Sequence, residues 1–74
     1  MTSESAFWPE LLASARKLRG LSQRAAAREI GTSARSLCRW EGGVVPLPVF
    51  RRAILRTVRV WVEEALEELG QAEQ

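Results

Sequence analysis

The sequence predicts an all-α fold, a compact domain of four to five helices that ends in one long C-terminal helix. Apolar residues recur along most of the chain at spacings of three and four, which is the period of an amphipathic helix. Glycines interrupt this pattern up to Gly43, as expected between short helices. Between Pro48 and Gly70 there is no further glycine or proline, which permits a single helix of about 33 Å at 1.5 Å per residue. Two helices separated by a kink would also fit this stretch.

The first helix is expected over about residues 9–19. Pro9 suits the first position of a helix, because its fixed φ angle is helical and its missing N–H would have no acceptor there. Gly20 is the expected end. The residues before Pro9 begin with small and polar side chains, so residues 1–8 are expected to form a flexible N-terminus.

The next two helices are expected over about residues 23–30 and 34–41. A serine precedes each of them, and its hydroxyl can accept a hydrogen bond from an N–H of the first turn. Only residues 31–33 connect the two helices, and two short helices joined by such a glycine-containing turn form a helix-turn-helix. Residues 9–48 are therefore expected to form a helix-turn-helix core. The capping serines and the helix-ending glycines are Ser22, Ser33, Gly31, Gly42 and Gly43.

Charge is strongly segregated along the chain. All eleven basic residues, ten of them arginine, lie between Arg16 and Arg59, where there are only two glutamates. From Val60 onward there are five glutamates and no basic residue. A basic body favours a polyanionic partner, and arginine suits phosphate and guanine recognition. Ordinary solubilising charge, or the codon bias of a GC-rich genome, would give a similar composition.

Missing residue types argue against catalysis. The sequence has no His, Asp, Asn or Tyr, and its single cysteine, Cys38, has no imidazole to activate it. Nucleophile–base pairs and zinc sites of the usual kind cannot be built from the rest, so we expect no enzyme, no metal and no cofactor. With no disulfide, no signal peptide and no membrane-spanning apolar stretch in the sequence, a cytoplasmic location and no membrane contact are expected.

One run of residues is distinctive. After Leu21-Ser22-Gln23 the chain reads Gly-x-Ser-x-x-Ser-Leu-x-Arg-Trp-Glu-x-Gly over residues 31–43. With this run, residues 11–50 resemble the Cro-type (phage-repressor-like, lambda-repressor-like) helix-turn-helix family. The resemblance implies a sequence-specific regulator of transcription that binds double-stranded DNA. The expected activity is repression of a phage or mobile-element promoter by a homodimer.

The third helix is expected to present two arginines on its outer face. If Leu37 points inward, a turn of about 100° per residue places Arg35 and Arg39 at about 160° and 200°, side by side on the opposite face. Arginine can bind the O6 and N7 atoms of guanine with two hydrogen bonds in the major groove. Arg35 and Arg39 are therefore candidates for base reading, against the alternative of a merely solvated surface, and the resemblance adds Ala34 to them.

The resemblance also implies contacts to the DNA backbone. The position of Gln23 binds a phosphate in the family, from the start of the second helix, where the helix dipole favours an anion. Ser33 and Ser36 match positions that touch backbone or base. Arg24 and Arg28 lie one turn apart and are candidates for flanking phosphates, or are simple surface charge.

Other family positions have structural roles. The resemblance implies an ion pair between Arg16 of the first helix and Glu41 after the third, with a phosphate contact by Arg16 as the alternative. Ala26 stands where the family usually has a larger aliphatic residue, so Trp8 or Trp61 is expected to fill the space. Leu37 and Trp40 are expected in the core, and Cys38 at the border of the DNA face.

Residues 49–74 are expected to form a C-terminal helix that packs on the core, mediates dimerisation and ends in an acidic tail. Five of its side chains follow spacings of 3, 4, 3 and 4, a heptad seam for a second copy, although a single buried face without a dimer is the alternative. The seam comprises Leu55, Val58, Val62, Ala65 and Leu69. A neighbouring stripe suited to covering the core comprises Phe50, Ile54 and Trp61. Arginines that would reach phosphates, or pair with Glu63 or Glu67, are Arg51, Arg52, Arg56 and Arg59.

A different function remains open at this point: a helix-turn-helix fold reused as a protein-binding module, as in an antitoxin or an inhibitor of a host protein. The loop over residues 44–47 is apolar where relatives often carry basic or polar residues that bind phosphate. That loop and the acidic helix over residues 60–74 would be the surface for such a protein partner.

Overall fold

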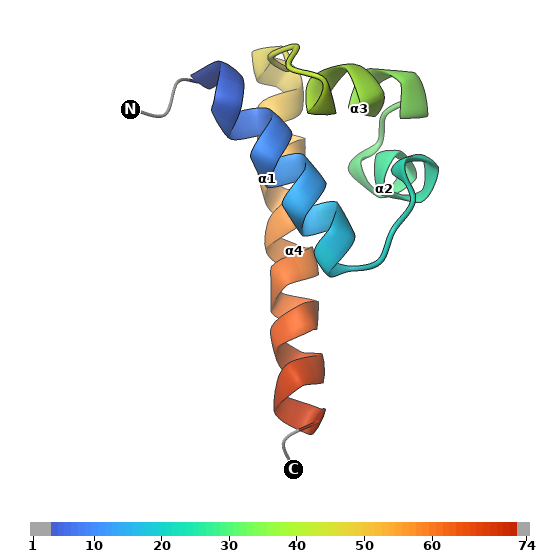
Figure 1. The fold of residues 1–74 in the computed structure, drawn as a ribbon, viewed down its shortest axis with the longest axis vertical. Helices are drawn as coiled ribbons and strands as arrows, with labels where there is room; N and C mark the ends of the chain where they lie inside the picture. Colours follow the sequence, from blue (N-terminus) through green and yellow to red (C-terminus); the bar gives the residue numbers. More distant parts are fainter. Residues whose placement is uncertain (1–3, 73–74) are drawn as a thin grey trace.

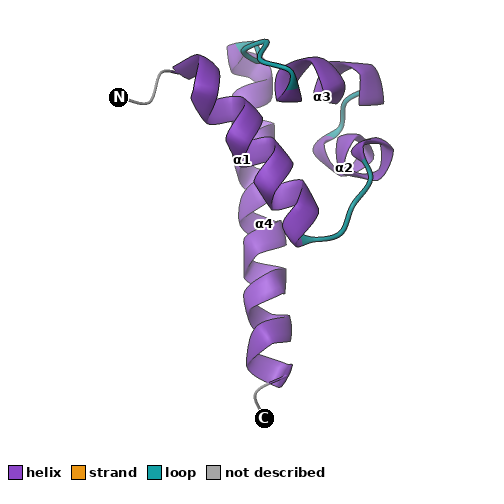
Figure 2. Ribbon diagram, in the orientation of Figure 1, coloured by secondary structure: helices purple, strands orange, loops and turns teal. Residues whose placement is uncertain are grey.

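The chain folds into four helices and no strand over residues 4–72, the part that the computed structural model describes (Figure 2). The predicted compact all-α fold with a long C-terminal helix is confirmed. In Figure 1, α4 runs the full height of the molecule, α1 crosses one face of it, and α2 and α3 lie to one side. The helices are α1 (Glu4–Leu18), α2 (Gln23–Ile30), α3 (Ala34–Glu41) and α4 (Pro48–Ala72).

Helix α1 begins five residues before the predicted start. Pro9 lies inside the helix, where a proline costs about 3 kcal/mol because it cannot donate the backbone hydrogen bond. The extra turn carries Trp8, whose side chain is 5% exposed and belongs to the core. Burying a large apolar side chain contributes about 1.5–3 kcal/mol, which offsets much of that cost. Residues 4–8 are therefore helical, which corrects the expectation of flexibility there, and residues 1–3 lie outside the described part.

The predicted bounds of α2 and α3 are confirmed, and so are their caps. The Ser22 hydroxyl accepts a hydrogen bond from the backbone N–H of Ala25 at 3.1 Å, and Ser33 caps α3 in the same way at 3.1 Å. Gly31 ends α2 with φ at +95°, a left-handed conformation that glycine adopts without steric cost. The two helices cross steeply, with α2 seen almost end-on beside α3 in Figure 1.

The core lies where α1, α2 and α3 meet the first half of α4. Ala26 is fully buried there, and both Trp8 and Trp61 belong to the same cluster; that one of them fills the space beside Ala26 stays a prediction. Ile54 and Trp61 are buried and Phe50 packs against them, so the predicted covering stripe of α4 is confirmed. The buried apolar residues are Trp8, Leu12, Ala15, Ala26, Ala27, Ile30, Leu37, Trp40, Ile54, Val58 and Trp61.

One polar contact inside this packing had no signal in the sequence. The indole Nε1 of Trp61 donates a hydrogen bond to Oε1 of Glu29 at 2.7 Å, which ties α4 to α2. This bond replaces the one that the indole N–H would make with water, whereas Nε1 of Trp8 is buried in the same core without a hydrogen-bond partner among the described residues.

Helix α4 is a single helix of 25 residues that continues through Gly70. The loop before it is only partly buried: Pro46 is in the interior and accepts a hydrogen bond on its carbonyl from Nε of Arg51 at 2.8 Å, while Val44 and Leu47 are exposed. None of the helices within residues 4–72 combines the length and the apolar character needed to cross a membrane.

Candidate nucleic-acid interface

Helix α3 has one buried and one exposed face. Leu37 is fully buried and Trp40 is 6% exposed, whereas Arg35 and Arg39 are both exposed. The predicted placement of the two arginines on the outer face is thus confirmed. Neither guanidinium has a hydrogen bond or an ion pair within the described residues, so both are free to bind a ligand. Ala34 is half-buried at the first position of the same helix.

The two serines at the start of α3 are already hydrogen-bonded to each other. The Ser33 hydroxyl accepts from the backbone N–H of Ser36 and donates to the Ser36 hydroxyl, each at 3.1 Å. A hydroxyl has one proton to donate, so Ser33 is fully used as a donor. Ser36 still has its own proton, and it is therefore the serine that can donate to an oxygen outside the chain.

Arg16 and Glu41 form the predicted ion pair. Nε and Nη2 of Arg16 donate to the two carboxylate oxygens of Glu41 at 2.8 and 3.0 Å, and the two side chains are only 17% and 9% exposed. Nη1 of Arg16 donates to the carbonyl of Leu21 at 3.0 Å. The hydrogen bonds to Glu41 raise the pKa of the Arg16 guanidinium above its ordinary value. With all three nitrogens engaged, Arg16 fixes α1 against the end of α3, and the alternative of a phosphate contact is not favoured.

Gln23 lies at the first position of α2, where its side chain also meets this ion pair. Its Nε2 donates to Oε1 of Glu41 at 3.2 Å. An amide nitrogen has two protons, so one N–H remains to donate elsewhere. The carboxylate thereby positions the amide of Gln23, whose contact to a phosphate stays a prediction.

Arg24 and Arg28 are both exposed on α2, one turn apart as predicted. Within residues 4–72 neither has a hydrogen bond or an ion pair. Together with Arg35 and Arg39 they give α2 and α3 four unpaired positive charges, with no acidic residue between Gln23 and Arg39 other than Glu29. Glu29 itself accepts the hydrogen bond of Trp61.

A shallow groove of about 250 Å³ lies beside α3, between this helix and the loop that leads to α4. Ser36 and Arg39 are its polar lining residues, and the others are apolar. The exposed face of α3 therefore has an apolar edge. Cys38, predicted at the border of this face, is exposed and unpaired. The lining residues are Ser36, Arg39, Trp40, Val44, Val45, Leu47 and Phe50.

The predicted dimer seam does not form one continuous exposed stripe. Val58 is only 7% exposed and belongs to the core with Ile54 and Trp61, so it is not available to a second copy. The remaining large members of the seam are exposed, Leu55 at 47% and Val62 at 37% among them. The reason is the rotation of α4 about its own axis, because this rotation points one heptad position, Val58, toward the core of the same chain.

The acidic end of α4 is tied to α1 by a contact that the sequence did not indicate. Arg19 forms an ion pair with Glu68 at 3.0 Å and lies 4.0 Å from Glu64, and hydrogen bonding to Glu68 raises its pKa. Of the pairing expected within α4, the structure shows the ion pair between Nε of Arg59 and Glu63 at 3.1 Å. The residues next to each glutamate in the sequence do not distinguish the glutamates that face α1 from those that face solvent.

Comparison with known proteins identifies no relative: no family model, no curated protein and no solved structure matches this chain. Within residues 4–72, no group of three or more His, Cys, Asp or Glu side chains is placed to hold a metal ion.

Proposed function

We propose that this chain is a sequence-specific regulator of transcription that binds double-stranded DNA through α3. The observation that supports this most is the pair of exposed, unpaired arginines, Arg35 and Arg39, on a helix whose opposite face is fully packed. Helix α3 is capped at its start by Ser33 and fixed at its end by the ion pair of Arg16 with Glu41. A rigid helix with a basic outer face suits the major groove, which is wide enough to admit it.

The spacing of the two arginines sets what they can read. Four residues along a helix span about 6 Å, which is close to the rise of two base pairs. Arg35 and Arg39 can therefore each bind a guanine, about two base pairs apart, through the O6 and N7 atoms. Ala34, at the start of the same helix, is suited to an apolar contact with a thymine methyl group.

Contacts to the backbone would position α3 in the groove. The second amide N–H of Gln23 and the hydroxyl of Ser36 are the available neutral donors, and Arg24 and Arg28 are the available charges. Such contacts carry no sequence information but supply most of the salt-dependent affinity. Binding is thus expected to weaken with salt on every sequence, while discrimination resides in α3.

The biological role that fits best is repression of a phage or mobile-element promoter by a homodimer that occupies promoter DNA. The chain has one small domain and no second domain within residues 4–72 for an effector. A homodimer of this class binds two half-sites about 34–36 Å apart, so the operator is expected to be palindromic.

Fluorescence anisotropy tests the proposed DNA binding. The probes are a duplex from upstream of the protein's own gene and a scrambled duplex of the same composition, each at two salt concentrations. We expect tight binding to the first duplex only, lost in the variant Arg35→Ala/Arg39→Ala. Equal and weak binding to both duplexes, in the unaltered protein, would contradict specific control of that promoter.

A protein-binding module is the second candidate, and one observation favours it. Leu47 and Val49 are 65% and 75% exposed, next to the apolar groove beside α3, where a phosphate-binding loop would be polar. An antitoxin or an inhibitor of a host protein would use this apolar surface. DNA binding that is indifferent to sequence would favour this candidate over the regulator.

A further inference from the structure

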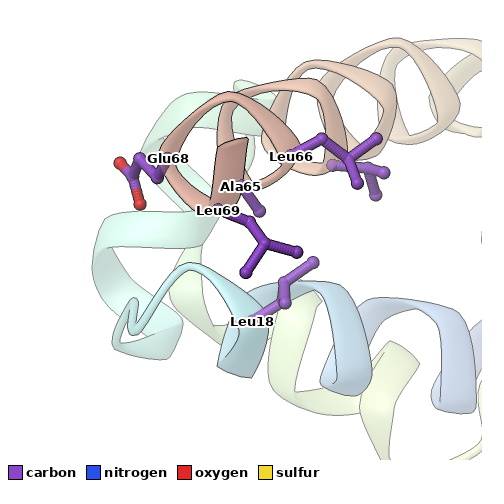
Figure 3. A pocket seen from close by; sticks show the side chains of 6 residues that line it. Leu18, Ala65, Leu66, Glu68 and Leu69 are labelled. Carbon is purple, nitrogen blue, oxygen red and sulfur yellow. The ribbon is translucent and has the colours of Figure 1, made fainter. Parts of the chain in front are cut away.

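The second half of α4 has an apolar stripe that its own chain does not cover. Leu66 and Leu69 are 62% and 58% exposed, and Leu18 of α1 faces them across a groove of about 420 Å³ (Figure 3). Leu55 and Val62 extend the same stripe toward the start of the helix, since a turn of about 100° per residue places all four within roughly 60° of one another. In Figure 1 the last turns of α4 project beyond α1 and α2.

Charges beside this stripe change sign along the helix. Arg52, Arg56 and Arg59 precede the middle of α4, and Glu63 and Glu67 follow it; all five are exposed. Arg56 and Glu67 are eleven residues apart, which is about three full turns of the helix. The two residues therefore lie on nearly the same face of α4, about 16 Å apart along its axis. That distance is too great for the two side chains to pair within one chain.

We propose that α4 pairs with α4 of a second copy in antiparallel orientation, with the two-fold axis close to Val62. This arrangement would place Leu55 opposite Leu69 of the other copy, and Arg56 opposite Glu67. Each of these pairs, like the pair of Arg59 with Glu63, has its midpoint within about one residue of Val62. A parallel pair would instead place arginine opposite arginine and glutamate opposite glutamate, which is destabilising.

The two kinds of contact have different roles in this dimer. Burial of the apolar stripe provides the stabilisation, because apolar area removed from water is the main favourable contribution to association. Exposed ion pairs contribute little each, but like charges in the wrong orientation are costly, so the charges select the antiparallel dimer. The intrachain pair of Arg59 with Glu63 is highly exposed and can exchange partners on dimerisation.

The antiparallel dimer also has a consequence for the helix-turn-helix. Helix α3 lies beside the first turns of α4 (Figure 1), so the two copies of α3 would lie at opposite ends of the pair. From Val62 to Pro48 is about 21 Å along each helix, which places the two starts of α4 roughly 42 Å apart. That separation is of the order of one helical turn of DNA, the spacing of half-sites.

Charge reversal tests the orientation, with sedimentation equilibrium of the full chain in the absence of DNA. Arg56→Glu and Glu67→Arg should each raise the dissociation constant of the dimer about five- to tenfold, since the symmetry repeats every change. The double variant R56E/E67R should return the constant toward that of the unaltered protein. Glu10→Arg, an exposed charge reversal on α1, is the matched control and should leave the constant unchanged. A double variant no better than the single ones, or a protein that stays monomeric at the highest concentration reached, would overturn the proposal.

Cysteine crosslinking provides a second test that needs no change of charge. In a background with Cys38→Ser, Val62→Cys should form a disulfide between the two chains of the dimer. The two-fold axis brings this position close to the same position of the other copy, and a disulfide needs Cα atoms about 4.4–6.8 Å apart. Leu55→Cys and Leu69→Cys chains should crosslink when mixed but not separately. Self-crosslinking of each separately would mean a parallel seam and would overturn the antiparallel dimer.

This proposal rests on the homodimer of the proposed function. Neither test contains DNA, so a failure of the antiparallel dimer is distinguishable from a failure of DNA binding.

Discussion

The helix-turn-helix and the second half of α4 differ in where their apolar faces go. In α2 and α3 the apolar side chains are buried by the chain itself, as Ala26 and Leu37 show at 0% exposure. In the second half of α4 the side chains at helical spacing, such as Leu66 and Leu69, remain mostly in solvent. A periodic apolar pattern therefore predicts that a helix has a face to bury, but not whether its own chain buries it.

The largest difference between these two regions is expected on truncation of an apolar side chain. Leu37→Ala in α3 should lower the free energy of unfolding by about 2–5 kcal/mol, because the side chain is 0% exposed and its truncation leaves a cavity in the core. A domain of this length has only about 4–11 kcal/mol in total, so this loss would remove a large part of its stability. Urea unfolding followed by far-UV circular dichroism measures this loss.

Leu66→Ala is the matched substitution in the second half of α4. Measured at a protein concentration where the chain is monomeric, it should change the free energy of unfolding by no more than about 0.5 kcal/mol, because the side chain is already 62% exposed. A loss as large as that of Leu37→Ala would mean that the apolar stripe is buried within the monomer, and would remove the contrast between the regions.

A smaller effect is expected from the ion pair that joins α1 to the end of α3. Arg16→Met keeps much of the side-chain volume but removes the hydrogen bonds to Glu41 and to the carbonyl of Leu21. Hydrogen bonds to charged groups contribute about 1.5–3 kcal/mol, so a loss of about 2–3 kcal/mol is expected in the same unfolding experiment. Arg59→Met removes an exposed ion pair of α4 and should cost no more than about 0.5 kcal/mol. Equal losses in the two variants would argue against a structural role for Arg16.

The smallest of these effects is expected at the cap of α3. Ser33→Ala removes the acceptor for the backbone N–H of Ser36 and should cost about 1 kcal/mol. Ser36→Ala leaves that N–H capped, so thermal unfolding should show a clearly smaller loss for this control. If Ser33→Ala and Ser36→Ala lower the stability equally, the loss comes from the hydrogen bond between the two hydroxyls rather than from the cap.

Sequence reasoning was most accurate where structure is determined locally. The bounds of α2 and α3 follow from Ser22, Ser33 and Gly31, whose caps act within one helical turn. The outer position of Arg35 and Arg39 follows from the helix period once Leu37 is placed inward. The ion pair of Arg16 with Glu41 is long-range, and it was predicted only from an expected resemblance of residues 11–50 to a known family.

The missed features depend on how separate helices are rotated against each other. Whether Val58 or Leu55 enters the core depends on a rotation of α4 that a repeat of 3 and 4 does not specify. The same rotation brings Glu68 to Arg19 and Trp61 to Glu29. The early start of α1 has a related cause, since Pro9 indicates a helix start locally whereas the gain from burying Trp8 comes from distant residues.

The most direct test of the central claim, that Arg35 and Arg39 read bases, is the ratio of affinities for the specific and the scrambled duplex in the variant Arg35→Lys/Arg39→Lys. Lysine keeps the charge but lacks the rigid planar fork with which arginine donates two parallel hydrogen bonds to guanine. Each contacted guanine should then lose about 1–3 kcal/mol of discrimination, so the ratio should fall at least tenfold, while affinity for the scrambled duplex and its salt dependence stay unchanged. An unchanged ratio would contradict base reading by these arginines and would assign both of them to phosphates.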